Sequence, residues 1–252
     1  MKWEKKMDLW EKDKKHPMTH KDVDTSYAIS RLDAGRMFLK HTKSNVKGKK
    51  VLDVAVGSGG ILCSFAEKGA FCYGLDVEDY FLEISKARFK ELKLKYKKIS
   101  KWKGGGYKIP YPDEYFDFII CTDTLHHAPK WRYFVSEICR VMKPGAKIFV
   151  GEERRWFPQY ILKSPHDNMP FTILLPKKLR VWIQKNILKL PSLDHYMFSF
   201  SFEIKNAFKK YGVELKDIDH MKREVFERNK YPEIIWPVYN LMFMHFIGTK
   251  QK

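Results

Sequence analysis

The sequence has few cysteines and no long apolar run, and these absences exclude several classes of protein. The cysteines stand singly among apolar residues and form no C-x-x-C pair, so neither a zinc site nor a disulfide scaffold is indicated. No stretch reaches the roughly 18 uninterrupted apolar residues of a membrane-spanning helix, and the charged start lacks the apolar segment of a signal peptide. We therefore expect a cytoplasmic protein whose cysteines are small core residues in a reducing compartment, namely Cys63, Cys72, Cys121 and Cys139.

Acidic residues are also scarce relative to basic ones. Lys and Arg number 48 against 30 Asp and Glu, which gives a net charge of +18 and a pI near 9.6. This excess favours an anionic partner, such as nucleic acid, an anionic membrane surface or an acidic substrate, but a solvated lysine-rich surface explains it equally well. With 252 residues, of which 44% are hydrophobic and 15% aromatic, the chain can build a sizeable core in one large domain or two small ones.

Strand-like apolar runs alternate with helix-like patterns over most of the chain. Apolar runs at 51–56, 71–77, 116–122 and 147–152 predict buried strands, and further strands are expected near 213–218 and 241–248. Between them, helical spacing occurs at 26–41, from Ile61 to a stop at Gly69, at 79–96, from Pro129 to Lys143, and at 202–211. This alternation predicts an α/β protein with a doubly wound, mostly parallel sheet.

The alternation lapses between residues 153 and 200, which divides the chain into four regions. We expect an N-terminal arm and lid helix at 1–44, a ligand-binding core at 45–152, a helical insert at 153–200, and a helix and strands at 201–252 that complete the sheet. Because the insert leaves the sheet after its fourth clear strand, it should cover the carboxyl ends of the strands, where ligands bind in such folds.

A glycine-rich turn and two acidic residues mark a candidate ligand site. Gly57-Ser-Gly-Gly follows an apolar strand and opens a helix, so the backbone can approach a ligand and the helix N-terminus favours negative charge. Leu62 stands where the dinucleotide-binding pattern requires glycine, which argues against NAD. Asp53 lies inside the first strand, and Asp76 ends the second, where a carboxylate can accept from both hydroxyls of a ribose. Asp76 alone would equally fit a helix cap.

Five segments in this order resemble class I S-adenosylmethionine-dependent methyltransferases. They are Val51-Leu-Asp-Val-Ala-Val-Gly-Ser-Gly-Gly, Gly74-Leu-Asp-Val, Ile109-Pro-Tyr-Pro-Asp-Glu-Tyr-Phe-Asp, Thr122-Asp-Thr-Leu-His-His and Glu137-Ile-Cys-Arg-Val-Met-Lys-Pro-Gly. The likeness is greatest to the ubiquinone/menaquinone-type (type 11) small-molecule methyltransferases. It covers about residues 45–152, and a weaker likeness extends over residues 194–220. It implies a seven-stranded Rossmann-like sheet, S-adenosylmethionine as cofactor and S-adenosylhomocysteine as product.

The same resemblance implies roles for individual residues. The amino-acid part of the cofactor would be surrounded by Asp53, Ala55, Gly57, Ser58 and Gly59, and Asp76 would hold the ribose. Val77 would pack on the adenine, with Gly105, Gly106 and Tyr107 beside it. Thr122 would lie under the cofactor. Two positions depart from the family pattern. Ala55 replaces the first glycine of the usual run, and Gly105 replaces the acid that accepts from the adenine amino group, so adenine must be recognised by backbone groups or another side chain.

Two adjacent histidines are candidates for catalysis. His126 and His127 follow the strand at 116–122, at the edge where a methyl group would be delivered, and a neutral imidazole can take a proton from an oxygen or nitrogen nucleophile. We take His127 as the first choice of base, with His126, Glu152, Glu153 and His195 as further candidates. A purely structural role for both histidines is the alternative, and no spacing indicates a metal site.

The segment at 173–191 is a basic amphipathic helix that either lies on an anionic membrane or packs as a lid on its own domain. Because the insert and C-terminus are rich in Phe, Tyr, Trp and Met, we expect the acceptor to be small and apolar or lipid-linked. RNA methylation and a non-catalytic cofactor-binding subunit are the alternatives, and the evenly spread charge disfavours nucleic acid. A membrane-associated protein would act from the cytoplasmic side. The oligomeric state and the methylated atom are left open.

Overall fold

A single seven-stranded sheet organises the computed structural model, which describes residues 2–6, 25–153, 175–187, 189, 201–218 and 243–251. Its strands are β1 (Lys50–Asp53), β2 (Phe71–Asp76), β3 (Lys98–Lys101), β4 (Phe116–Thr122), β5 (Met142–Glu153), β6 (Val213–Asp217) and β7 (Phe243–Lys250). The order across the sheet is β3-β2-β1-β4-β5-β7-β6, and β7 runs antiparallel to both of its neighbours while the other pairs are parallel. The predicted α/β class with a mostly parallel sheet is confirmed.

Central strands of the sheet, such as β1 and β4, are buried on both faces, which explains their nearly continuous apolar sequence. Neighbouring side chains alternate between two cores: Leu52 belongs to one and Val51 to the other, and Ile148 and Phe149 divide in the same way. Such alternation follows from the two-residue period of a strand. Helices must therefore cover both faces.

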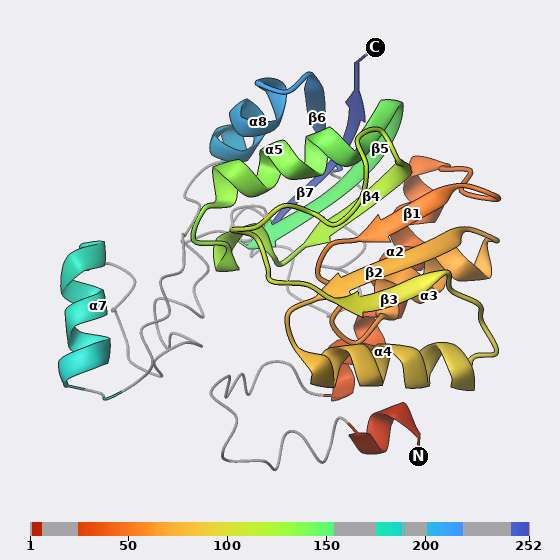
Figure 1. Cartoon of the computed structure of the whole chain (residues 1–252), viewed down its shortest axis with the longest axis horizontal. Coiled ribbons are helices and arrows are strands. Elements are labelled where there is room, and N and C mark those ends of the chain that lie inside the picture. Colours follow the sequence, from red (N-terminus) through yellow and green to blue (C-terminus); the bar gives the residue numbers. More distant parts are fainter. Residues whose placement is uncertain are drawn as a thin grey trace, which may run out of the picture.

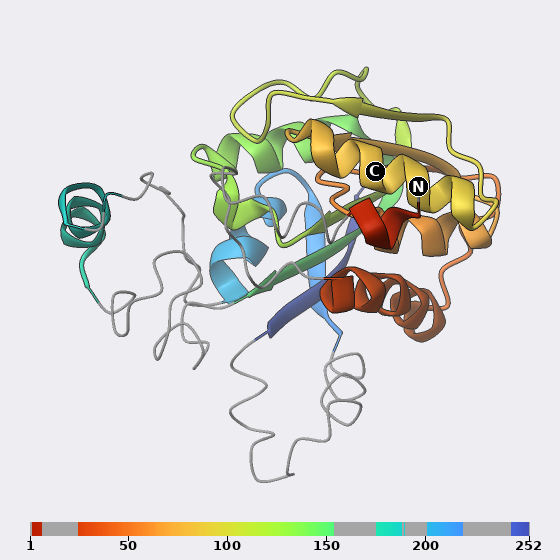
Figure 2. The same ribbon diagram turned by 90° about the horizontal axis from the view of Figure 1, so that it is seen from below.

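Five helices supply these covering layers (Figures 1 and 2). On one face lie α2 (Thr25–Thr42), α3 (Gly60–Glu67) and α4 (Asp79–Glu91), whose side chains join the cluster around Phe38, Phe65 and Phe118. On the other lie α5 (Trp131–Val141) and α8 (Ser201–Lys209), which bury Phe134 and Phe208 against the sheet.

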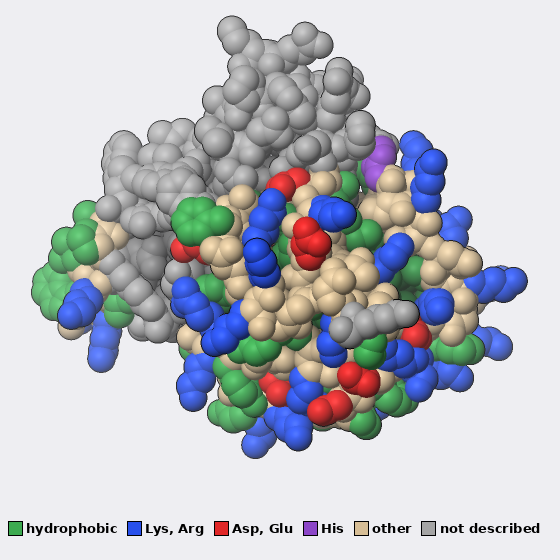
Figure 3. All heavy atoms as spheres, turned by 90° about the horizontal axis from the view of Figure 1, so that it is seen from above, with side chains coloured by type: hydrophobic (Ala, Val, Ile, Leu, Met, Phe, Trp, Pro, Cys, Tyr) green, Lys and Arg blue, Asp and Glu red, His purple; other side chains and the backbone are tan. Residues whose placement is uncertain are grey.

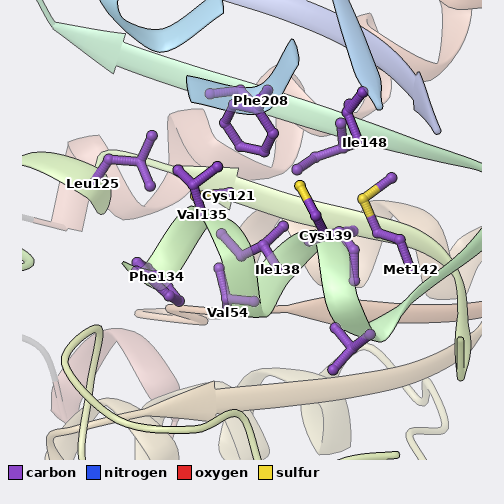
Figure 4. Close-up of a cluster of buried hydrophobic side chains, with 14 of the residues drawn as sticks. Val54, Cys121, Leu125, Phe134, Val135, Ile138, Cys139, Met142, Ile148 and Phe208 are labelled. Carbon is purple, nitrogen blue, oxygen red and sulfur yellow. The ribbon is translucent and has the colours of Figure 1, made fainter. Parts of the chain in front are cut away.

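The core beneath α5 contains two of the four cysteines. Figure 4 shows Cys121 of β4 and Cys139 of α5 among aliphatic and aromatic side chains, with Phe208 of α8 in the same cluster. All four cysteines are buried and unbridged, as the sequence predicts. Burial raises the pKa of the Cys139 thiol to about 12, which makes it a poor nucleophile at neutral pH.

The structure corrects several predicted boundaries. Strand β3 was not expected, because this edge strand buries only Ile99 and its sequence, Lys-Ile-Ser-Lys, lacks an apolar pattern. The helix predicted at 79–96 ends at Glu91, and α5 begins at Trp131 rather than at Pro129. Strand β5 begins at Met142 because the pairing with β4 shifts register over Lys143-Pro-Gly-Ala before resuming at Lys147.

The N-terminal arm and lid helix predicted at 1–44 are described at residues 2–6, which form a helical turn packed on α4, and from Thr25 onwards, where α2 begins. Trp3 is buried beside Ile84, and Lys6 pairs with Glu83 at 2.9 Å. Of the insert predicted at 153–200, the structure describes residue 153, which still belongs to β5, residue 189, and residues 175–187, which include α7 (Lys177–Asn186). The remaining insert positions, with the aromatic residues expected to cover an acceptor, lie outside the described residues.

Candidate functional site

Polar side chains from four strands meet at one edge of the sheet. Asp53, Asp76, Thr122 and Glu152 stand at or next to the carboxyl ends of β1, β2, β4 and β5, and each is at least nine-tenths buried. Strands β1 and β4 are neighbours although they are not consecutive. The chain adds β2 and β3 on one side of β1 and then crosses over to place β4 on the other side. Ligands bind at this kind of switch point in open α/β sheets.

The glycine turn lies above the end of β1 and requires its glycines. Gly57 and Gly59 have φ of +49° and +76°, in the left-handed region that side chains disfavour. A Cβ on Gly59 would come within 2.5 Å of the Ser85 hydroxyl, whereas one on Gly57 would meet nothing within 4 Å. Helix α3 begins immediately afterwards with no side-chain cap, so its first backbone N–H groups are available to an anionic ligand group.

Asp76 links this turn to the second strand. One carboxyl oxygen accepts from the backbone N–H of Gly57 at 2.8 Å, and the other accepts from Glu78 at 3.1 Å. Asp76 is not the N-cap of α4, which is Glu78 and has no side-chain cap hydrogen bond; the carboxyl group instead connects the residue before α4 with the glycine turn. Each carboxylate oxygen has a second lone pair, so both can also accept from ligand hydroxyls.

Asp53 is buried below the turn with a single backbone donor, the N–H of Ala55 at 3.3 Å. Burial raises the pKa of Asp53 to about 8, because the ionised carboxylate loses its hydrating water and gains little from the protein in return. The negative charge of Asp76 acts in the same direction, while Arg31 opposes it. A cationic ligand group beside Asp53 would favour its ionised form.

Arg31, on α2, reaches the same edge and was missed by sequence reasoning. Its guanidinium donates to the Thr122 hydroxyl at 2.6 Å and pairs with Asp123 at 3.0 Å. Helix α2 comes this close because Gly60 has no side chain: a Cβ there would lie 2.7 Å from the Cβ of Arg31. Asp123 itself has a φ of +51°, an uncommon backbone conformation for a residue other than glycine. An arginine in a helical pattern carries no signal that its helix crosses these strand ends.

A buried arginine of α4 contacts the glycine turn. Arg88 of α4 donates to the carbonyl of Ala28 at 2.7 Å and lies 3.4 Å from the Ser58 hydroxyl. The ring of Trp3 stacks over its guanidinium at 4.2 Å. Arg88 therefore connects α2 and the N-terminal turn to the glycine turn through Ser58, which was predicted as a cofactor contact.

The residues predicted to contact adenine are brought together beside β2. A Cβ on Gly104 would lie 3.0 Å from Val77, which places the loop against that side chain. Val77 and Tyr107 are exposed and can cover a ligand ring, and Gly106 faces open space. Gly105 instead faces the core, where a Cβ would approach Ala128 to 2.5 Å. The acid expected in the family at this position has no room here.

Glu152 organises the loop that carries the two histidines. One carboxyl oxygen accepts from the backbone N–H groups of Thr124 and Leu125 at 2.9 and 2.7 Å, and the other bonds Nδ1 of His126 at 2.6 Å. No sequence pattern pointed to this carboxylate partner. A carboxylate on Nδ1 fixes the ring and places its basic lone pair on Nε2 in the neutral form. The ring of His127 lies against that of His126, with centroids 4.0 Å apart.

Other predicted candidates are not positioned by the structure. His195 lies outside the described residues, and so does the side chain of Glu153. Within the part of the chain that is described, no group of three His, Cys, Asp or Glu residues could hold a metal ion, and no helix is long and apolar enough to cross a membrane. The site that the structure assembles therefore consists of the glycine turn, three carboxyl groups, Arg31 and the histidine pair.

Comparisons with known proteins agree with this geometry. Residues 52–150 match the family described as "Methyltransferase domain". A demethylmenaquinone methyltransferase of Corynebacterium glutamicum is 29% identical over 135 residues, which cover 52% of this chain and 55% of the relative. A ubiquinone biosynthesis O-methyltransferase of Coxiella burnetii is 26% identical over 188 residues, covering 68% and 76%. The chain thus spans about half the length of the first of these curated relatives.

Among solved structures, an S-adenosylmethionine-dependent methyltransferase from Mesorhizobium loti has the same fold. The TM-score is 0.59 at 17% identity, over 87% of this chain and all of that one. The region that matches the family, residues 52–150, contains the glycine turn, Asp53, Asp76 and the loop that hydrogen-bonds Glu152. Residues 52–150 thus match a methyltransferase domain, and the described sheet has the class I S-adenosylmethionine-dependent methyltransferase fold.

Proposed function

We propose that this protein transfers a methyl group from S-adenosylmethionine to a small apolar or lipid-linked acceptor. The observation that carries the proposal is the direct hydrogen bond between Asp76 and the glycine turn, beside the buried carboxyl of Asp53. This arrangement offers acceptors for ribose hydroxyls and an anionic position for an ammonium group. The methyltransferase names of the relatives support the same activity.

Each part of the cofactor has a matching group in this arrangement. Asp76 would accept from the ribose hydroxyls, Asp53 would face the ammonium group, and Val77 would lie against the adenine. Arg31 is placed to receive the carboxylate, because a guanidinium that now pairs with Asp123 can make the same charge-assisted bonds to a ligand carboxylate. The backbone of residues 104–107 would take over adenine recognition, since Gly105 cannot carry a side chain.

The bound cofactor supplies an electrophilic methyl group on a sulfonium, and the protein's task is to align the acceptor and exclude water. An acceptor that carries a proton also needs a base. The bond from Glu152 to Nδ1 makes His126 better oriented for this task than His127, our first choice from the sequence. Nε2 of His126 would take the proton, and Glu152 would stabilise the resulting imidazolium. Glu152 itself acts as a positioning residue.

The acceptor class rests on the aromatic-rich sequence of the insert and on the quinone-related names of the relatives. RNA is the second candidate because of the net charge of +18. Against it, Figure 3 presents Lys and Arg side chains scattered over the visible face and interspersed with acidic ones, rather than gathered in one stripe. A non-catalytic cofactor-binding subunit would keep the same cofactor residues without turnover.

Calorimetric titration with S-adenosylhomocysteine tests the cofactor site. One site is expected, and Asp76→Ala should weaken binding more than tenfold, or about 1.4 kcal/mol. Asp79→Ala is the matched control, because that acid pairs with Lys101 on the surface a few residues away and its side chain is 70% exposed. Unchanged affinity in Asp76→Ala would refute the ribose assignment.

Turnover is tested with labelled S-adenosylmethionine and a set of acceptors that includes a demethylated prenylquinone, a soluble phenol and tRNA. Label should enter the quinone or phenol, and His126→Gln should lower kcat by roughly 10²-fold with cofactor affinity unchanged. Label entering tRNA alone would favour the RNA alternative, and cofactor binding without transfer to any acceptor would favour the non-catalytic one.

A further inference from the structure

Helix α7 presents large apolar side chains to solvent. The exposed fractions are 44% for Leu179, 54% for Trp182 and 58% for Ile187, whereas α5 buries its valines and isoleucine in the core and exposes one large aromatic side chain, Tyr133, at 43%. In both ribbon views α7 stands apart from the helices and strands of the sheet (Figures 1 and 2). No described helix or strand therefore covers this apolar face. An exposed apolar face of this kind indicates a binding partner.

The exposed residues share one side of the helix. The exposed Leu179 and Trp182 and the half-buried Ile183 are spaced at i, i+3 and i+4, and the exposed Ile187, the C-cap residue of α7, follows one turn later. At 3.6 residues per turn these positions form a single stripe. Lys178 and Lys185, both exposed, project along one border of the stripe. Figure 3 shows hydrophobic and basic side chains next to each other at the α7 end of the molecule.

The charge around α7 is of one sign. No acidic residue stands between Asp167 and Asp194, although the whole chain has 30 acids to 48 basic residues. The basic residues in that interval are Lys177, Lys178, Arg180, Lys185 and Lys189. This local charge is complementary to an anionic surface, and its combination with an apolar stripe is what a membrane interface requires.

We propose that α7 binds an anionic lipid surface and lies in the plane of the interface. Leu179, Trp182 and Ile187 would enter the boundary of the acyl chains, with the indole at headgroup level and the lysine stems extending to the phosphates. The ten residues of α7 span about 15 Å, half of the roughly 30 Å hydrocarbon core, so the helix lies on the surface. Nucleic acid would use the lysines but would leave the aliphatic side chains uncovered.

Co-sedimentation with vesicles tests this inference without any methyl acceptor. The full chain should bind vesicles of mixed phosphatidylcholine and phosphatidylglycerol and should not bind phosphatidylcholine alone. Raising NaCl from about 50 to about 300 mM should weaken binding about tenfold, because the Debye length shortens from roughly 14 to 6 Å. Quenching of tryptophan fluorescence by brominated lipid should be reduced in Trp182→Phe, which places that residue in the interface.

Matched charge reversals identify the helix responsible. Lys178→Glu with Lys185→Glu should lower vesicle binding at least tenfold, whereas Lys86→Glu with Lys90→Glu, which makes the same charge change on the exposed face of α4, should have little effect. Leu179→Ser with Ile187→Ser should weaken binding while leaving the charge intact. All these variants should bind S-adenosylhomocysteine like the parent protein, so a failure of the proposed methyl transfer and a failure of this inference are distinguishable.

Three outcomes would overturn the inference. The first is an absence of binding to the anionic vesicles, and the second is equal losses in the α7 and α4 charge reversals. The third is salt-sensitive binding to tRNA that the α7 reversal abolishes while vesicle binding persists, which would assign the basic face of α7 to nucleic acid.

Discussion

Replacement of Glu152 by alanine should destabilise the protein far more than replacement by glutamine. Glu152 is 1% exposed and accepts three hydrogen bonds, from the backbone of Thr124 and Leu125 and from His126. Alanine leaves two buried N–H groups without an acceptor, at about 1–3 kcal/mol each, so we expect a loss of about 2–6 kcal/mol. For a domain with a total stability of roughly 5–15 kcal/mol this is a large effect.

Glutamine keeps an acceptor for the two backbone groups but turns an amide N–H₂ toward the histidine. His126 must then accept at Nδ1 and carry its proton on Nε2, the opposite of the arrangement expected in the native protein. We expect a stability loss below about 1.5 kcal/mol together with a change of tautomer, which ¹⁵N NMR of the imidazole detects. Catalysis that depends on Nε2 as a base would fall on the order of 10²–10⁴-fold.

Urea denaturation followed by circular dichroism measures these differences, with the slope held common to the variants. Glu83→Ala is the control, since that residue is 65% exposed and makes a surface ion pair with Lys6, worth at most about 1 kcal/mol. Glu152→Ala within about 1 kcal/mol of the parent protein, or equal losses in the alanine and glutamine variants, would refute the role given to the carboxyl group.

Three further predictions concern the cofactor site. Burial raises the pKa of Asp53 to about 8, so the Asp53 carboxyl must lose its proton before it can bind the ammonium group of the ligand. As the pH is raised toward 8, the affinity for S-adenosylhomocysteine should increase by up to about tenfold per pH unit. Calorimetry should find a smaller pH dependence in Asp53→Asn. Arg31→Met should weaken S-adenosylhomocysteine about tenfold or more but leave adenosine, which has no carboxylate, unchanged; equal losses would make Arg31 a structural residue. Gly105→Asp should cost about 1–3 kcal/mol and lower Tm, because its Cβ would lie 2.5 Å from Ala128, while Gly106→Asp, with nothing within 4 Å, should be tolerated; a stable Gly105→Asp variant would contradict this packing.

Much of the fold was predictable because buried parallel strands and amphipathic helices have strong local patterns. The apolar runs at 51–56, 71–77 and 116–122 are recognisable without knowledge of their neighbours, although the first of these strands ends earlier than predicted, at Asp53. The edge strand β3 was not predictable, since one buried residue, Ile99, is too little pattern to distinguish a strand from a loop. The shift over Lys143-Pro-Gly-Ala was hidden because the pairing of β5 with β4 depends on tertiary contacts.

The site divides along the same line. The sequence alone determined the glycine turn and the acids at the strand ends, because backbone conformation and strand position depend on nearby residues. Tertiary structure decided which distant groups meet there: Arg31 reaches Thr122 only because Gly60 lets α2 approach, and Glu152 contacts His126 only because β5 lies beside β4. It also decided that Gly105 faces the core. Contacts between residues far apart in the chain depend on how the layers pack, and no local pattern encodes that packing.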